Sequence, residues 1–345
     1  MQLASAALFD DSINHAAPLG PMRDVEFIEM PVRTVLNRCE NLRRPFRWTI
    51  NPYRGCEFGC VYCYARYTHE FLELRDPMDF ERRIFVKRMA AQVLSHTLAR
   101  TPIGSDPIAI GTATDPYQPA ERKYGLTRSM LEVFAQLGGL DLSITTKSAL
   151  IVRDLDLLRA INSRSKISVN FSLMTLNRRL QRTLEPRAPR PELRLRALAE
   201  LSRAGIRCNL LMMPVIPGLT DAPAAIESVV RAARRAGASA VWWRSLFLKP
   251  AAARRFIPFI NEHFPAVAKQ IDEFYARAVY APRGYDERLG AIFDRMRGKY
   301  GFKVDHRDRR EPVRTAAPAM APGTQLSLGV RSFRPRQEEV RQDTR

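Results

Sequence analysis

Short apolar runs alternate with amphipathic helical patterns from residue 46 to about residue 280, and this alternation restricts the fold more than any other feature. Six runs predict strands, and each is followed by a helical pattern. The runs are residues 46–50, 107–113, 140–146, 166–173, 206–215 and 238–248. Because they read as continuous apolar segments, we expect a parallel sheet buried on both faces. Six units are fewer than the eight of a closed barrel, so the sequence predicts an α/β fold, a partial TIM-like barrel.

The regions flanking this repeat differ in composition. Residues 1–45 are polar and contain several prolines, which predicts an N-terminal extension. The barrel is assigned to residues 46–250, in which residues 78–100 predict one long amphipathic helix. Residues 251–302 predict a helical segment. Residues 303–345 are basic and proline-rich with few large apolar side chains, which predicts a disordered tail.

The chain of 345 residues carries 55 Lys and Arg against 36 Asp and Glu, a formal net charge of +19. Clustered cations displace counterions from phosphate backbones, so this charge favours DNA or another nucleic acid as a partner. Arginine-rich codon usage is the alternative explanation. The N-terminus lacks a secretion signal and the longest apolar run is too short to span a bilayer, so we expect a cytoplasmic protein without a membrane partner.

Three of the five cysteines, Cys56, Cys60 and Cys63, stand at C-x3-C-x2-C spacing after the first predicted strand. Gly55 and Gly59 allow that loop to wrap closely around a ligand, since glycine tolerates positive φ. Structural zinc takes four protein ligands, and a redox dithiol needs only two thiols. An iron–sulfur cluster held by three thiolates, with one iron left open, fits the count best.

The other candidate metal ligands have weaker contexts. His69 is the nearby residue that could complete a zinc site, but it lies in an ordinary helical pattern. Cys39 lies in the predicted extension. Cys208 lies in an apolar strand and is expected to be a small core residue.

The cysteine spacing, its place after the first strand and the aromatic Tyr62 resemble the radical S-adenosylmethionine (SAM) superfamily. The resemblance implies a 4Fe-4S cluster on Cys56, Cys60 and Cys63, whose open iron binds the amino and carboxylate groups of SAM. An electron, from a donor such as flavodoxin or ferredoxin, would cleave SAM and give a 5′-deoxyadenosyl radical that abstracts hydrogen from a substrate.

Longer segments resemble one branch of this superfamily, the spore photoproduct lyase-like or "DNA repair photolyase" type. They are NPYRGCEFGCVYCYAR (51–66), GTATDPYQPAE (111–121), TTKS followed by RD (145–154) and PVIPGLTD (214–221). The resemblance covers roughly residues 46–250 and implies a lyase acting in DNA repair. The alternatives are the same chemistry on RNA, protein or a small metabolite, or a non-enzymatic iron–sulfur protein that binds nucleic acid or carries electrons.

The same resemblance implies cofactor-binding residues at the ends of the strands. Thr114 and Asp115 would hold the SAM amino group, although Asp115 could instead cap its own turn. Lys147 would offer a charge to the SAM carboxylate, and Ser172 would bond the ribose hydroxyls. The segment 184–192 either faces this end of the barrel or forms a plain turn between helices.

Further residues complete the implied site. Pro214 and Ile216, after the fifth strand, would pack on the adenine of SAM. Tyr62 is assigned to the cofactor site, with core packing as its alternative, and Tyr64 to a catalytic hydrogen-atom relay. The lyase has a cysteine hydrogen donor that aligns best with Thr112. A threonine hydroxyl does not give up its hydrogen easily, so spore photoproduct repair itself is not expected.

Two further segments suggest partners. Residues 324–330 (TQLSLGV) resemble the Gln-Leu-Ser-Leu-Phe peptide that docks on the bacterial sliding clamp, with Gly329 in place of the aromatic. Residues 242–250 carry two tryptophans near Arg244 and Lys249. These tryptophans either stack on a flipped base or pack in the core.

Overall fold

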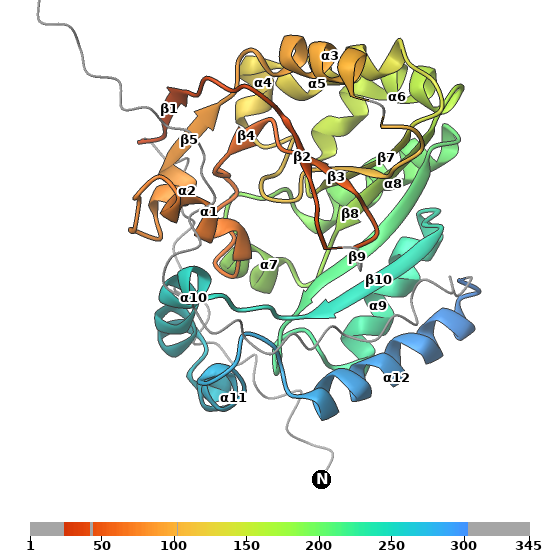
Figure 1. Cartoon of the computed structure of the whole chain (residues 1–345). Helices are drawn as coiled ribbons and strands as arrows, with labels where there is room; N and C mark the ends of the chain where they lie inside the picture. Colours follow the sequence, from red (N-terminus) through yellow and green to blue (C-terminus); the bar gives the residue numbers. More distant parts are fainter. Residues whose placement is uncertain (1–23, 42–43, 102, 303–345) are drawn as a thin grey trace, which may run out of the picture. The chain divides into compact units, whose positions relative to one another are not determined.

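Parallel strands follow one another in chain order across the central sheet (Figure 1). The computed structural model describes residues 24–41, 44–101 and 103–302, and within them the strand order is β10-β9-β8-β7-β6-β3-β2. The six parallel strands are β3 (Trp48–Ile50), β6 (Ile108–Ile110), β7 (Asp141–Thr146), β8 (Lys166–Ser172), β9 (Arg207–Val215) and β10 (Ala240–Ser245). β2 (Leu36–Arg38) pairs antiparallel with β3 at one edge, and β10 forms the other edge. The predicted partial barrel is therefore confirmed.

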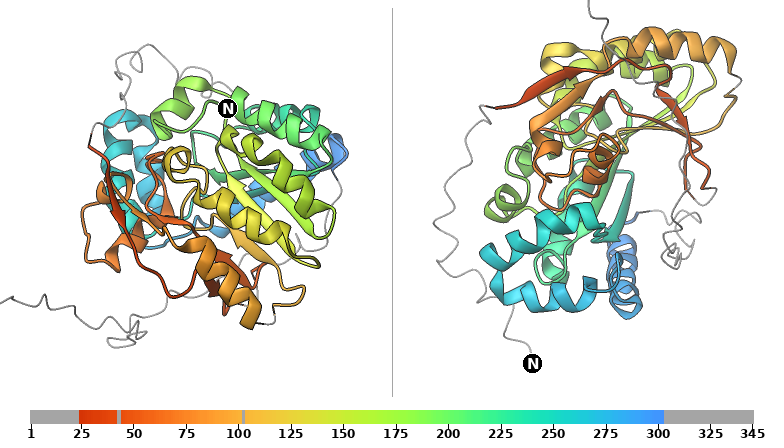
Figure 2. Two further views of the ribbon diagram at one scale, coloured as in Figure 1. Left: turned by 90° about the horizontal axis from the view of Figure 1, so that it is seen from above. Right: turned by 60° about the vertical axis from the view of Figure 1, so that its left-hand side comes forward.

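Helices connect the strands and cover the outer side of the sheet (Figure 2). They are α3 (Ala90–Arg100), α4 (Ala120–Tyr124), α5 (Leu126–Ala135), α6 (Leu155–Asn162), α7 (Arg178–Leu184), α8 (Pro191–Arg203) and α9 (Pro223–Arg235). In α9, Ile226, Val229 and Val230 are buried at three- and four-residue spacing, which packs one stripe of the helix on the sheet.

The expectation of a sheet buried on both faces holds for β6, whose three residues are all buried, but not for β7 and β8. In β7, Leu142 and Ile144 are buried against the helices, whereas Ser143 and Thr145 on the other face are half-buried. β8 shows the same alternation. The inner face of β7 and β8 therefore carries small polar side chains, which suits binding of a polar ligand.

The expected single helix over 78–100 is also wrong. The segment divides into α2 (Asp79–Arg82), β5 (Arg83–Val86) and α3. β5 pairs parallel with β1 (Glu26–Glu29) and antiparallel with β4 (Tyr53–Arg54), and together they form a second, three-stranded sheet. The β-branched and aromatic residues of β5 favour this pairing, and β1 and β2 lie within the predicted N-terminal extension.

The C-terminal part of the described chain is helical, as expected. It contains α10 (Pro250–His263), α11 (Pro265–Tyr275) and α12 (Arg283–Lys299), and α12 lies beside β10 (Figure 1). Trp243 of β10 stacks on Phe293 of α12 with ring centroids 5.1 Å apart, which supports the core-packing alternative for this tryptophan. The clamp-like segment 324–330 and the predicted tail lie outside the described residues. No helix of the described part is long and apolar enough to cross a membrane.

Candidate active site

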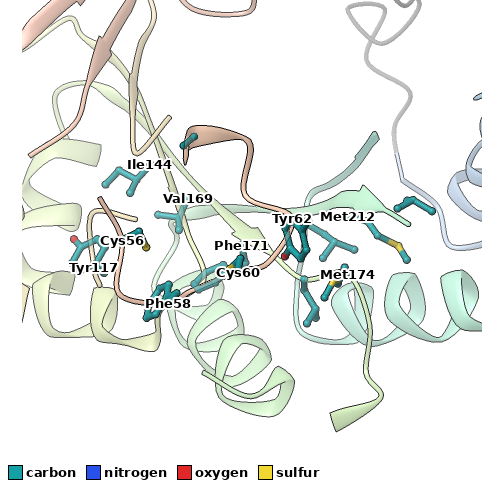
Figure 3. Close-up of a cluster of buried hydrophobic side chains, with 14 of the residues drawn as sticks. Cys56, Phe58, Cys60, Tyr62, Tyr117, Ile144, Val169, Phe171, Met174 and Met212 are labelled. Atoms are coloured by element: carbon teal, nitrogen blue, oxygen red, sulfur yellow. The ribbon is translucent and has the colours of Figure 1, made fainter. Parts of the chain in front are cut away.

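The three clustered cysteines lie on the loop that follows β4. Cys56 and Cys60 are buried and Cys63 is partly buried, and all three are free thiols. Figure 3 shows Cys56 and Cys60 on this loop, in one cluster of buried side chains with Val169 and Phe171 of β8. The short strand β4 separates this loop from β3, the strand after which the cysteines were expected.

Backbone hydrogen bonds to distant parts of the chain hold the cysteine loop. The N–H of Cys56 donates to the carbonyl of Phe80 at 2.9 Å, and the N–H of Val61 donates to the carbonyl of Leu184 at 3.0 Å. The Oε1 atom of Gln118 accepts from the Glu57 N–H at 2.9 Å. The loop conformation is therefore fixed by the protein itself.

The two glycines of the loop are needed for different contacts. Gly55 has φ +89°, and a Cβ there would lie 2.8 Å from the carbonyl oxygen of Arg83 and 2.9 Å from that of Phe80. Gly59 has φ +64°, and its Cβ would meet the side chains of Glu81 and Arg187. Both glycines allow the chain to pass where no larger residue fits.

Gly55→Ala is expected to lower the free energy of unfolding by about 1–3 kcal/mol more than Gly125→Ala, because two backbone carbonyls would have to move. Gly125 is the matched control, since it has φ +62° but open space around its Cβ position. Chemical denaturation of both variants measures the difference. Equal losses would show that the close approach at Gly55 has no energetic weight.

A buried ion-pair network supports one side of the loop. Glu81 of α2 is 1% exposed and pairs with Arg66 at 3.2 Å and also with Arg187. Arg66 donates to the carbonyl of Cys60 at 2.9 Å, and Arg187 donates to the carbonyl of Glu57 at 2.5 Å. Two positive charges and one carboxylate thus hold the backbone on both sides of Cys60.

A second buried network contains three of the predicted site residues. Glu185 accepts hydrogen bonds from the Tyr62 hydroxyl and from Arg194, and its Oε1 lies 3.6 Å from the Lys147 ammonium. Lys147 donates to the Ser172 hydroxyl at 2.8 Å. The ends of β7 and β8 and the turn after α7 therefore meet beside the cysteine loop. Glu185 is not a plain turn residue, and the 184–192 segment faces this end of the barrel.

Neighbouring charges set the protonation of this network. Burial alone would lower the pKa of Lys147, but Glu185 and Cys60 outweigh it and raise that pKa. Burial would raise the pKa of Glu185, but Arg194 and Lys147 hold it below its usual value. Lys147 is therefore a cation at neutral pH, as binding of a carboxylate requires.

Thr114 and Asp115 lie after β6, and other groups of the chain occupy their side chains. The Asp115 carboxylate accepts from the N–H groups of Tyr117 and Lys147 and from the Thr146 hydroxyl, at 2.7–2.9 Å. The capping alternative for Asp115 is thus present in the structure. The Thr114 hydroxyl donates to the Gly55 carbonyl at 2.5 Å. Both side chains position the cysteine loop and the backbone of Lys147.

Pro214 and Ile216 differ in accessibility. Pro214 is half-buried at the end of β9, where an adenine could pack against it. Ile216 is fully buried in the core, and its N–H donates to the Thr220 hydroxyl at 2.7 Å. Of the two predicted adenine contacts, Pro214 has the accessible side chain.

Tyr64 lies at the accessible side of the site. It is 39% exposed, its hydroxyl donates to the Thr112 carbonyl, and its ring is 6.1 Å from that of Phe247. The Thr112 hydroxyl accepts from Asn51, whose carbonyl accepts from Lys87 at 2.7 Å. The tyrosine proposed for the relay is thus both exposed and oriented by the end of β6.

Lys87 is a buried cation with an energetic cost. Burial lowers its pKa from 10.5 to about 8, and Arg54 adds to the shift. Below pH 8 the folded state bears the full cost of the charge, and this cost falls as the pH rises to 10.5. Lys87→Gln is therefore expected to be about 3 kcal/mol more stable than the natural chain near neutral pH.

The measurement is urea denaturation of both proteins at several pH values. The difference in free energy of unfolding should shrink steadily above pH 8 and vanish near 10.5. A difference that does not change with pH would contradict a desolvated ammonium at Lys87.

The donor set suits a multi-iron cluster. Burial raises the pKa of all three thiols, to about 12 for Cys60, so bound iron would supply the positive charge that thiolates need here. Among the described residues, no three His, Cys, Asp or Glu side chains converge on a single-ion site. A cluster places each thiolate on a different iron, and three separate thiolates on one fixed loop match that demand.

The remaining metal-ligand candidates lie in other surroundings. The Nε2 atom of His69 lies 3.0 Å from the Arg83 carbonyl, and its ring packs on Phe80. Cys208 is fully buried in β9, as expected of a core residue. Cys39 is partly exposed beside Asn41.

These features define a parallel α/β barrel with three thiols and a cationic network at the carboxyl ends of its strands, the usual place for catalysis in such folds. The chain belongs to the radical SAM superfamily, whose family model matches residues 50–229. The resemblance stated from the sequence is thereby confirmed. Enzymes of this superfamily use a 4Fe-4S cluster and SAM.

Relatives cover most of the chain. "Uncharacterized protein Rv2578c" of Mycobacterium tuberculosis is 34% identical over 284 residues, which are 82% of this chain and 83% of that protein. "Uncharacterized protein MJ0683" of Methanocaldococcus jannaschii is 27% identical over 64% of this chain and 77% of that protein.

Solved structures of spore photoproduct lyase share the fold. A complex with dinucleoside spore photoproduct has a TM-score of 0.59 and 14% identity, and covers 84% of this chain and 86% of that one. A mutant with bound AdoMet and dinucleoside spore photoproduct has a TM-score of 0.57 and 15% identity, over 79% of each chain. At this identity the likeness supports the same architecture.

Proposed function

We propose that this radical SAM enzyme holds its 4Fe-4S cluster on Cys56, Cys60 and Cys63 and abstracts hydrogen from a nucleic-acid substrate in a lyase-like reaction. The observation that carries the proposal is the fixed loop of three thiols, two of them buried, beside Lys147 and Ser172. When bound, the cluster and SAM supply an electron and a 5′-deoxyadenosyl radical.

The protein's own residues bind and orient SAM in this proposal. Lys147 holds the SAM carboxylate while Glu185 and Ser172 fix the position of its ammonium. Ser172 also reaches the ribose hydroxyls, and Pro214 packs on adenine. Tyr62 is held by Glu185 and closes the inner side of the cofactor site, and the cluster of buried side chains around it excludes water.

Tyr64 is proposed to relay a hydrogen atom between the substrate and SAM. Its exposed ring can contact a substrate, and its bond to the Thr112 carbonyl fixes the direction of its O–H. Thr112 stands where the lyase has a cysteine, and its hydroxyl accepts a bond from Asn51. The proposal therefore excludes Thr112 as the hydrogen donor, and with it the repair of spore photoproduct by the lyase's own route.

Nucleic acid is proposed as the substrate on two grounds. The net charge of +19 favours a polyanion, and the solved structures that share this fold contain a dinucleoside. RNA, a peptide and a small metabolite are the alternatives for the same chemistry.

The test starts with the full chain, reconstituted anaerobically with iron and sulfide and reduced with dithionite. Addition of SAM should give 5′-deoxyadenosine, measured by chromatography, while protein reconstituted without iron should give none. Deuterated SAM is then offered with damaged DNA, RNA and peptides, and deuterium exchange with one of them identifies the substrate. A fully loaded, reduced protein that forms no 5′-deoxyadenosine would contradict the proposal.

A further inference from the structure

Two basic residues share one face of the small sheet next to the cysteine loop. β4 and β5 pair antiparallel, with Tyr53 opposite Val86 and Arg54 opposite Phe85. Because side chains alternate along a strand, Arg54, Phe85 and Lys87 project from the same face. Lys87 follows β5 directly, and the positive charge of Arg54 acts on it.

This pair of cations lacks compensating charge. Lys87 is 8% exposed, and its ammonium has three donors, one of which is bonded to the Asn51 carbonyl. Among the described residues, neither Lys87 nor Arg54 forms an ion pair with a carboxylate. An ammonium kept in this position costs stability, so a bound anion would remove a cost that the free protein bears.

The pair lies beside the proposed reaction site. Asn51 links Lys87 to Thr112, and Thr112 links to Tyr64. A third cation stands nearby, because the ammonium of Lys249 lies 3.7 Å from the ring centroid of Tyr67. The hydrogen-bonded chain therefore runs from Lys87 to the exposed Tyr64.

We propose that Arg54 and Lys87 form a phosphate-binding pair that holds a backbone phosphate of the nucleic-acid substrate next to Tyr64. A guanidinium binds two phosphate oxygens at once, and an ammonium adds a compact charge. Lys249 and Tyr67 extend the surface toward the next nucleotide. The inference rests on the proposed function in one respect, that the phosphate belongs to a nucleic acid. Binding of a phosphate by the two cations follows from their own charge.

The test measures binding of a fluorescein-labelled oligothymidine to the full reconstituted protein by anisotropy, without SAM, at several salt concentrations. Arg54→Gln and Lys87→Gln should each weaken binding about tenfold. The double variant should reduce the steepness of log affinity against log salt by about 0.7, because the contact to one phosphate is lost. Arg207→Gln and Lys166→Gln are the controls. Both residues are exposed and begin their strands, β9 and β8, at the ends away from the proposed site.

Each outcome is decisive. Unchanged affinity and slope in the double variant, with a normal melting temperature, would overturn the proposal, as would equal losses in the control variants. Competition by inorganic phosphate as strong as by unlabelled oligonucleotide would overturn the assignment to nucleic acid. The Lys87→Gln variant should be more stable while binding less, which a structural lysine would not produce. SAM cleavage is a separate readout, so failure of the proposed reaction does not alter the binding result.

Discussion

Cys60→Ala is expected to abolish both cluster binding and formation of 5′-deoxyadenosine. Each thiolate binds one iron of the cluster, and two remaining ligands cannot hold it against loss of iron. The backbone of the loop should survive, because the carbonyl of Cys60 accepts from Arg66 and from the N–H of Cys63, and alanine keeps that carbonyl. Iron and sulfide content, visible absorption and product chromatography measure the effect.

Cys208→Ala is the matched control for this experiment. It removes another buried thiol, from β9, so the iron content and product yield of this variant should equal those of the natural chain. If Cys60→Ala keeps its iron, or if Cys208→Ala loses it, the assignment of the ligands is wrong.

Glu185→Gln is expected to cost about 3–5 kcal/mol of folding stability, because it leaves buried cations without their counter-charge. Arg194 is fully buried and bonds to Glu185, and Lys147 lies close to the same carboxylate. Because the pKa of Glu185 is held low, the contribution is complete above the unfolded value near 4.5 and is lost as the pH falls below it.

Glu192→Gln provides the comparison. Glu192 pairs with Arg178 at the surface, where an ion pair is worth about 1 kcal/mol or less. Urea denaturation of both variants, without metal and at neutral pH, gives the two losses. Similar small losses would mean that the network around Glu185 does not stabilise the fold.

The strands and the cysteine loop were predictable from the sequence because both are local patterns. In β8, for example, Ile167, Val169 and Phe171 recur at every second position, and the spacing of Cys56, Cys60 and Cys63 is explicit. The break of residues 78–100 was not predictable, because the pairing that makes β5 a strand comes from β1 and β4, which both lie far earlier in the chain.

The charged networks could not be predicted for a different reason. Nothing near Glu81 or Arg194 in the sequence indicates that they are buried, since their partners come from other elements. The motif around Asp115 was visible in the sequence. Its two interpretations, binding of the SAM amino group and capping of its own turn, differ only in which hydrogen-bond donors reach the carboxylate. That depends on where β7 ends, and it became known only with the fold.

The bracing of the cysteine loop by distant carbonyls has a consequence for maturation. Since these hydrogen bonds do not involve sulfur, the polypeptide should fold first and bind iron afterwards on a preformed loop. Oxygen damage that strips the metal would then leave an intact scaffold, which the cell could refill without synthesising the enzyme again.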